Sequence, residues 1–207
     1  MSQEHQKTKR PVVTIAAPSD FNAGEWVPLL AENKEAAVQI SSIYSKDDIL
    51  EMVQNIKNQG VSWYIGFDYK QGRIGICATE YYSKPNGKAI YFSLERESSR
   101  VRNVMFPDSL DPVGKIMSLF SGYYPIAVAT EPDINNSKYF AGLVRAMQYE
   151  STIHFDFAQR QLSGWAIAKC ETQLAVVIYL QLPQEGGELI IYDKLWDEQD
   201  DVFNKDN

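Results

Sequence analysis

Hydrophobic side chains recur at helical spacing in residues 46–58. Ser45 and the acidic residues that follow it resemble a helix N-cap with an acidic first turn, and Gly60 stands where a glycine C-cap is expected. The pattern therefore predicts a helix over 46–58. The dipeptide Asp111-Pro112 predicts the start of a second helix, because proline is favoured at the first helical position.

Short apolar runs bounded by turn residues occupy much of the remaining chain and predict β-strands. The predicted strands are 40–44, 63–67, 74–82, 89–94, 139–147, 166–169, 174–182 and 189–192. Residues 131–137 are polar and predict a turn region. From Lys138 onward the strands follow one another with short connections, which is typical of an antiparallel sandwich, jelly roll or barrel.

No linker pattern divides the chain into separate domains. We expect residues 1–11 to form a flexible tail and residues 12–207 to form a single domain. Within that domain we expect 12–137 to be an N-terminal support region and 138–207 to be a β-rich core.

Composition narrows the class of protein. Hydrophobic residues make up 44% and charged residues 23% of the 207 residues, as in ordinary globular proteins. The formal net charge of -7 disfavours binding to nucleic acid, because an acidic surface repels phosphates. No apolar run is long enough to span a membrane, and residues 1–10 are too polar for a signal peptide. With two cysteines and no Cys-x-x-Cys pair, we expect a cytoplasmic protein with reduced thiols and no thiolate zinc site.

The tripeptide His154-Phe155-Asp156 is the sharpest chemical signal in the sequence. Residues i and i+2 of a strand point to the same side, so the imidazole and the carboxylate could project together. One histidine and one carboxylate make two thirds of the 2-His-1-carboxylate triad that holds non-haem Fe(II). The alternative is a buried histidine oriented by Asp156, since a His-x-Asp pair often occurs by chance.

The surrounding residues carry a family resemblance. Residues 139–147 read Tyr-Phe-Ala-Gly-Leu-Val-Arg-Ala-Met and are followed by Ile-His-Phe-Asp-Phe-Ala, Ser-Gly-Trp, Gly-Gly-Glu-Leu-Ile-Ile-Tyr-Asp and a closing Leu-Trp. This order resembles the iron(II)/2-oxoglutarate oxygenase superfamily. It is most similar to the small-molecule branch that contains free-amino-acid hydroxylases and lysine-type radical halogenases. The resemblance implies an α+β fold, mainly β with flanking helices, in which 138–207 forms part of a double-stranded β-helix, or jelly roll.

The resemblance also implies roles for individual residues. His154 and Asp156 match the proximal metal ligands, and the implied cofactors are Fe(II) and the co-substrate 2-oxoglutarate. Arg145, Gln173 and Tyr179 match positions near the cofactor pocket. Arg145 could instead form a structural ion pair, and Tyr179, like Trp165, could instead be a packing residue. No catalytic residue is implied beyond the metal ligands.

Asp156 bears on the type of reaction. The halogenases of this branch have glycine or alanine at the matching position, which leaves a place on the metal for chloride. A carboxylate at 156 fills that place, so the sequence favours hydroxylation, or another hydrogen-abstraction outcome, over halogenation. The substrate that the resemblance implies is a small molecule such as a free amino acid.

The sequence departs from the family pattern after Gly186-Gly187. The family has a second metal histidine and an arginine for 2-oxoglutarate beyond this turn, but the 20 residues after Gly187 contain neither. The last strands of the jelly roll are also missing from the pattern. We therefore expect a chain that is inactive or weakly active alone, and that self-associates through open sheet edges. It could be a truncated product, a natural short form, or a chain completed by another chain. The alternative function is that of a non-catalytic jelly-roll binding or interaction protein with a vestigial metal site.

Overall fold

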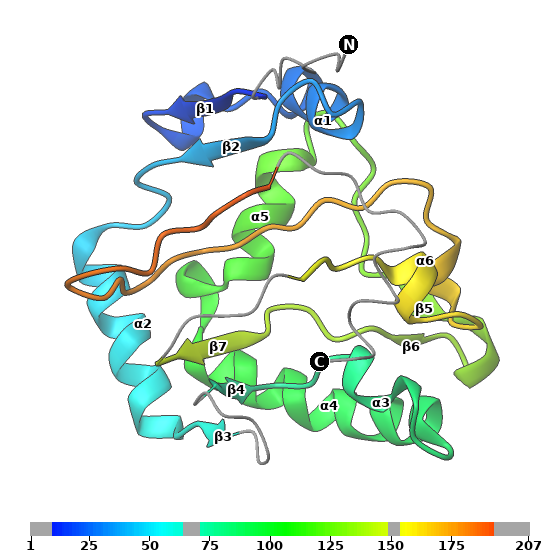
Figure 1. The fold of residues 1–207 in the computed structure, drawn as a ribbon. Coiled ribbons are helices and arrows are strands. Elements are labelled where there is room, and N and C mark those ends of the chain that lie inside the picture. The colour runs from blue at the N-terminus through cyan, green and yellow to red at the C-terminus, as the bar shows by residue number, and fades with distance from the viewer. Residues whose placement is uncertain (1–9, 64–70, 149–153, 193–207) are drawn as a thin grey trace, which may run out of the picture. The chain divides into compact units, whose positions relative to one another are not determined.

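The computed structural model describes residues 10–63, 71–148 and 154–192 (Figure 1). The chain forms two compact units. The first consists of residues 1–41 and 188–207, and the second of residues 42–187. The prediction of one domain over 12–207 stays a prediction.

The first unit contains a parallel strand pair joined by a helical crossover. Strand β1 (Val12–Ile15) pairs in parallel with β2 (Ala37–Ile40), and the 3-10 helix η1 (Pro18–Asp20) and helix α1 (Ala23–Ala31) lie between them in sequence. Parallel strands need such a crossover because the chain must return to the starting edge of the sheet before the second strand begins. A tight turn can join only antiparallel strands. Helix α1 begins after Asn22, whose side chain accepts a hydrogen bond from the Glu25 N–H. The predicted strand 40–44 is wrong except at Ile40, because β2 covers residues 37–40 and ends there.

Two helices of the second unit form where local signals predicted them. Helix α2 (Lys46–Gln59) has a capping box in which the Ser45 hydroxyl accepts from the Asp48 N–H and the Asp48 carboxylate accepts from the Ser45 N–H. It ends at Gly60, whose φ of 75° favours glycine. Helix α5 (Pro112–Phe120) begins after Asp111, whose carboxylate accepts from two first-turn N–H groups. Both helix predictions are confirmed.

The strand predictions for 74–82 and 89–94 are wrong over most of their length. Residues 79–82 form α3 (Thr79–Tyr82), and residues 89–94 lie inside the long helix α4 (Gly87–Met105; Figure 1). The aromatic run around Tyr91 has strand propensity, but packing overrides it. Tyr91 and Phe92 enter a buried cluster, and the polar half of α4 carries helix-spaced pairs such as Arg100 with Glu97.

Three small sheets hold the strands of the described residues. One is the β1–β2 pair, and a second is an antiparallel sheet in the order β3 (Ser62–Trp63), β4 (Gln71–Ile74) and β7 (Val144–Met147). The third pairs β5 (Thr130–Glu131) with β6 (Ser137–Lys138), and η3 (Pro132–Ile134) makes the turn between them. The predicted turn at 131–137 is therefore largely confirmed. The predicted strand 139–147 is reduced to 144–147, and residues 64–67 of the predicted strand 63–67 lie outside the described residues.

The remaining strand predictions are also corrected. Residues 166–169 form the 3-10 helix η4 (Ala166–Lys169), which follows the short helix α6 (Ala158–Gln161). Residues 174–182 and 189–192 pair with no strand among the described residues. The fold is α+β, as predicted, but the described residues are not mainly β, because helices hold more of them than strands do. The jelly roll stays a prediction.

Two buried clusters form the core of the second unit. In the first, side chains from α3, α4 and the region of α6 and η4 meet around Tyr91 and Trp165. In the second, Met52 of α2 packs with Ile74 of β4 and with Met105 at the end of α4. None of the helices in the described parts of the chain is both long and apolar enough to cross a membrane.

Candidate functional site

The His154–Asp156 segment lies immediately before α6. Residues 154–157 belong to neither a helix nor an assigned strand, and the side chains of His154 and Asp156 are exposed. Phe157 has φ −142° and ψ 103°, so the backbone is extended where it enters α6.

Two glutamine side chains bind the backbone of this segment. The amide oxygen of Gln161 accepts from the Phe157 N–H at 3.1 Å, and its amide nitrogen donates to the Phe155 carbonyl at 3.1 Å. The amide of Gln173 likewise bonds one N–H and one carbonyl, each one residue further along the chain. Its oxygen accepts from the Ala158 N–H at 2.8 Å, and its nitrogen donates to the Asp156 carbonyl at 2.8 Å.

These four hydrogen bonds have the alternation of a β-strand. The groups of residues 155 and 157 face one glutamine, and those of 156 and 158 face the other, as in extended backbone. In extended backbone, side chains two residues apart leave on the same side. The i, i+2 spacing therefore predicts that the side chains of His154 and Asp156 share a side, and both this relationship and their roles as metal ligands stay predictions.

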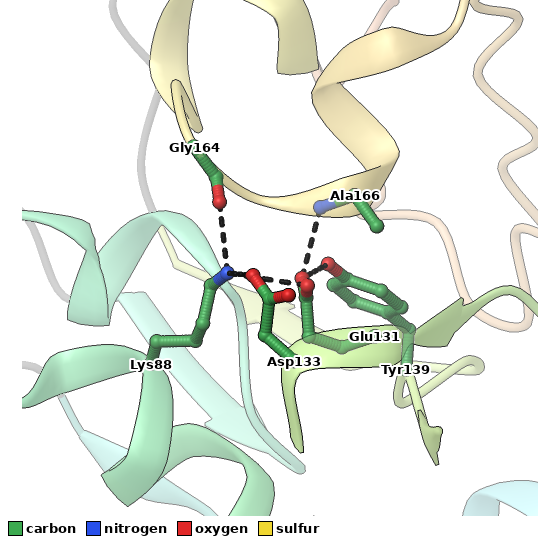
Figure 2. Close-up of polar contacts among 6 residues, drawn as sticks. All are labelled: Lys88, Glu131, Asp133, Tyr139, Gly164 and Ala166. Carbon is green, nitrogen blue, oxygen red and sulfur yellow. Dashed lines mark hydrogen bonds and ion pairs between the residues drawn. The ribbon is translucent and has the colours of Figure 1, made fainter. Parts of the chain in front are cut away.

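A buried carboxylate fixes the turn that follows α6. Glu131 is 1% exposed, and Figure 2 shows three donors around it. Its Oε2 accepts from the Tyr139 hydroxyl at 2.5 Å and from the Ala166 N–H at 2.8 Å, while its Oε1 lies 3.2 Å from Lys88 Nζ. A buried charge is costly unless it is paired and hydrogen-bonded, and here both conditions hold.

Lys88 connects this carboxylate to two further groups. Its Nζ donates to the Gly164 carbonyl at 2.8 Å and lies 3.4 Å from Asp133 Oδ2 (Figure 2). The ammonium also lies 5.9 Å from the centre of the Trp165 ring, within the range of a cation–π contact. Helix α4, the β5–β6 hairpin and the α6–η4 region are thereby joined through one polar network, defined by Lys88, Glu131, Asp133, Tyr139, Gly164 and Ala166.

The network shifts the pKa values of its two buried acids in opposite directions. Burial alone raises the pKa of Glu131, but the donors Tyr139, Ala166 and Lys88 outweigh it and hold that pKa below its ordinary value of 4.5. Burial and the neighbouring carboxylate raise the pKa of Tyr139 above 10. Glu131 is therefore an ionised structural acceptor at neutral pH, and Tyr139 a permanent donor.

An aromatic cluster surrounds the network. Trp165 is buried, and its ring centre lies 5.4 Å from that of Tyr91 in an edge-to-face arrangement. The interpretation of Trp165 as a packing residue is confirmed. The Tyr91 hydroxyl accepts from the Phe140 N–H at 2.9 Å, and burial raises the pKa of Tyr91 to about 12.

The other residues singled out in the sequence lie in different elements. Arg145 is exposed in β7, directly opposite Arg73 of β4, and Arg73 pairs with Glu80 at 2.7 Å. Tyr179 is 50% exposed in the segment 174–182. The assignments of Arg145, Gln173 and Tyr179 to a cofactor pocket stay predictions, but the amide of Gln173 is seen to bind backbone.

Two hollows flank the polar network. One of about 430 Å³ is lined by Tyr82, Lys84 and Lys88 among others, and one of about 310 Å³ by Glu131, Asp133 and Lys169 among others. Neither is lined by His154 or Asp156. These hollows therefore do not define a pocket around the two predicted ligands.

Sequence reasoning missed Gln161, Lys88, Glu131 and Tyr139. Gln161 is one of several polar residues after Asp156, and nothing in its spacing distinguishes it from Gln159. Glu131 lies in a polar turn, where a carboxylate is ordinarily solvated. Only the fold brings these side chains to their partners.

The donor types at 154 and 156 fit an iron site in part. An imidazole and a carboxylate are ligands that Fe(II) accepts in facial triads. Within the described ranges, no group of three or more His, Cys, Asp or Glu side chains is placed to hold a metal ion. The chain has only one other histidine, His5, which lies outside those ranges. His154 and Asp156 therefore match two of the three ligand types of such a triad, and their roles as ligands stay predictions.

Comparison with known proteins shows the class. The sequence matches the family model "carrier-protein-independent halogenase WelO5" over residues 12–207, which places it among iron(II)/2-oxoglutarate oxygenase-type proteins. The chain belongs to this WelO5 family. The resemblance to the oxygenase superfamily is therefore confirmed, while the free-amino-acid hydroxylase branch and the incomplete C-terminal part stay predictions.

One curated relative gives a second comparison. The "Leucinostatins biosynthesis cluster protein S" of Purpureocillium lilacinum is 28% identical over 130 residues, which are 62% of this chain and 53% of that protein. The chain thus spans about half the length of the curated relative it matches. No solved structure matches the chain.

Proposed function

We propose that this chain provides two Fe(II) ligands, His154 and Asp156, in a 2-oxoglutarate-dependent oxygenase site that hydroxylates a small molecule such as a free amino acid. The observation that carries the proposal is the fixed, extended His154–Asp156 segment in a chain of the WelO5 family. When bound, iron with 2-oxoglutarate would activate O2 as the oxidant for C–H hydroxylation, with succinate and CO2 as the other products. The protein residues would hold the metal and orient the substrate.

The carboxylate at 156 supports hydroxylation over halogenation. A halide needs a metal position that no protein ligand occupies, and a carboxylate ligand at 156 would take that position. The family name refers to a halogenase, so this one residue separates the two outcomes for this chain.

Metal binding is the first test. The chain should bind Co(II), an air-stable substitute for Fe(II), weakly in calorimetric titration, because a two-ligand site lacks one bond of a full triad. His154→Ala and Asp156→Ala should each abolish that binding. His5→Ala is the matched control and should leave it unchanged. Binding that survives His154→Ala, or that His5→Ala removes, would contradict the proposed ligand set.

Turnover is the second test. We expect little succinate from 2-oxoglutarate with the 207-residue chain alone, and restored formation when a His- and Arg-containing C-terminal segment from a complete relative is appended. With chloride present, the product should carry a hydroxyl group. A chlorinated product would refute the role given to Asp156. Absence of metal binding in both forms would favour a non-catalytic binding protein.

A further inference from the structure

We propose that Gln161 and Gln173 are positioning residues that clamp the His154–Asp156 segment from both sides. The inference depends on the proposed function for the identity of the metal, but the clamp itself is defined by hydrogen bonds alone. Each glutamine uses both halves of its amide on the backbone of residues 155–158.

The two glutamine amides make the hydrogen bonds that neighbouring strands would make on the two edges of this segment. In a parallel sheet, a residue of the adjacent strand bonds a carbonyl and an N–H that lie two residues apart on the same edge. Gln161 bonds this combination at Phe155 and Phe157, and Gln173 bonds it at Asp156 and Ala158. The segment is thereby held extended although it pairs with no strand among the described residues.

The glutamines are themselves anchored. Gln161 precedes Leu162, which is buried, and the Trp165 N–H donates to the Leu162 carbonyl at 2.9 Å. The next residue, Ala166, donates to the buried Glu131. Gln173 lies three residues after Cys170, which is held at both backbone groups. The Cys170 N–H donates to the Ile167 carbonyl of η4, and the Cys170 carbonyl accepts from the Gln159 amide of α6. The polar network around Glu131 is thus connected through α6 and η4 to the clamp.

Glutamine suits this task chemically. The side chain must accept from an N–H and donate to a C=O at once, and an amide carries its acceptor and its donor on two separate atoms. Glutamate lacks the donor, and asparagine is one methylene shorter. Gln173 also satisfies the Ala158 N–H, which is one of the first-turn groups of α6 that have no partner within the helix.

The consequence concerns the two ligands. The relative direction of the His154 and Asp156 side chains depends on the backbone torsions between them. Fixing residues 155–158 would present the imidazole and the carboxylate together before a metal arrives, which lowers the ordering cost of binding. Groups that orient metal ligands in this way typically change metal affinity about 10- to 100-fold when removed.

Amide hydrogen exchange, measured residue by residue by NMR, tests the clamp without any metal. Gln161→Ala should speed exchange at Phe157, and Gln173→Ala should speed it at Ala158, each leaving the other amide less affected. Gln173→Glu keeps the acceptor and loses the donor, so Ala158 should stay protected. Gln39→Ala, at an exposed glutamine of β2 that has no part in the clamp, is the matched control. Unchanged protection in α2 confirms that a variant is folded, and unchanged exchange at Phe157 and Ala158 would overturn the clamp.

Co(II) titration of the same variants tests positioning. Gln161→Ala and Gln173→Ala should each weaken binding about tenfold or more, and the control Gln39→Ala should not. Faster exchange with unchanged Co(II) affinity would overturn the positioning role. If the unaltered chain binds no Co(II), the proposed function fails, and the exchange result alone decides whether the clamp exists.

Discussion

The hydroxyl of Tyr139 donates to Oε2 of Glu131 at 2.5 Å, and both side chains are buried. The carboxylate also accepts from the Ala166 N–H and pairs with Lys88, so both of its oxygens have hydrogen-bond or ion-pair partners. Removal of one donor leaves a buried charge partly unsatisfied, and this costs more than the bond itself contributes.

Tyr139→Phe should therefore destabilise the fold by about 1–3 kcal/mol, since it removes a hydrogen bond to a buried charged group. Urea unfolding followed by circular dichroism measures the loss. Tyr123→Phe is the matched control, because Tyr123 is 53% exposed, and it should stay within roughly 0.5 kcal/mol of the unaltered chain. Equal effects of the two substitutions would contradict the importance of the buried bond.

Acid should weaken the fold through Glu131. The folded-state pKa of Glu131 lies below 4.5, so its stabilisation is fully present above the unfolded pKa. It is then lost as the pH falls from about 4.5 through the lower folded pKa. Unfolding free energies measured from pH 7 to pH 3 should show a smaller acid loss in Glu131→Gln, which cannot titrate. An identical pH profile would show that Glu131 makes no such contribution.

Gly87→Ala should destabilise α4 despite the higher helix propensity of alanine. A Cβ at Gly87 would lie 1.7 Å from the Tyr81 carbonyl oxygen, so backbone would have to move. The expected loss is about 1–3 kcal/mol, as for other overpacked sites. Gly122→Ala is the control, because a Cβ at that position would meet nothing within 4 Å. A higher melting temperature for Gly87→Ala than for the unaltered chain would refute this.

Residues 174–182 should promote self-association. Ile178 and Leu180 pack against the cluster around Met52, while Val177 and Tyr179 are 60% and 50% exposed. Because such an apolar face is prone to association, the double substitution Val177→Ser with Tyr179→Ser should lower the concentration-dependent size measured by sedimentation. Its thermal unfolding should change little. Ile178→Ser, on the packed face, should instead destabilise the chain. A monomer at all concentrations would contradict the prediction.

Local signals accounted for α2 and α5, because caps and helix spacing act between neighbours in sequence. They failed for α4. Its first half is rich in aromatic and β-branched residues, yet Tyr91 and Phe92 are buried by contacts with Tyr139 and Trp165, far along the chain. The same reason explains 166–169, where the Ala166 N–H is held by Glu131 rather than by a strand.

The candidate site shows the same division between local signals, which the sequence reveals, and long-range contacts, which it does not. The spacing of His154 and Asp156 predicts that their side chains share a side, and this stays a prediction because the hydrogen bonds of the segment begin at residue 155. The amide of Gln173 reaches Ala158 from 15 residues away, and Glu131 reaches Ala166 from 35, and no spacing rule connects them. What holds the predicted ligands in place is therefore visible only in the fold.

The contacts of Lys88 also bear on how the chain folds. Its partners Asp133 and Gly164 lie 45 and 76 residues further along. Closing such long loops costs entropy before the contacts offset it. We therefore expect the Lys88 contacts to form after the folding transition state, so that Lys88→Met would speed unfolding and leave the folding rate nearly unchanged. The network would then govern how long the native state persists rather than how fast it is reached.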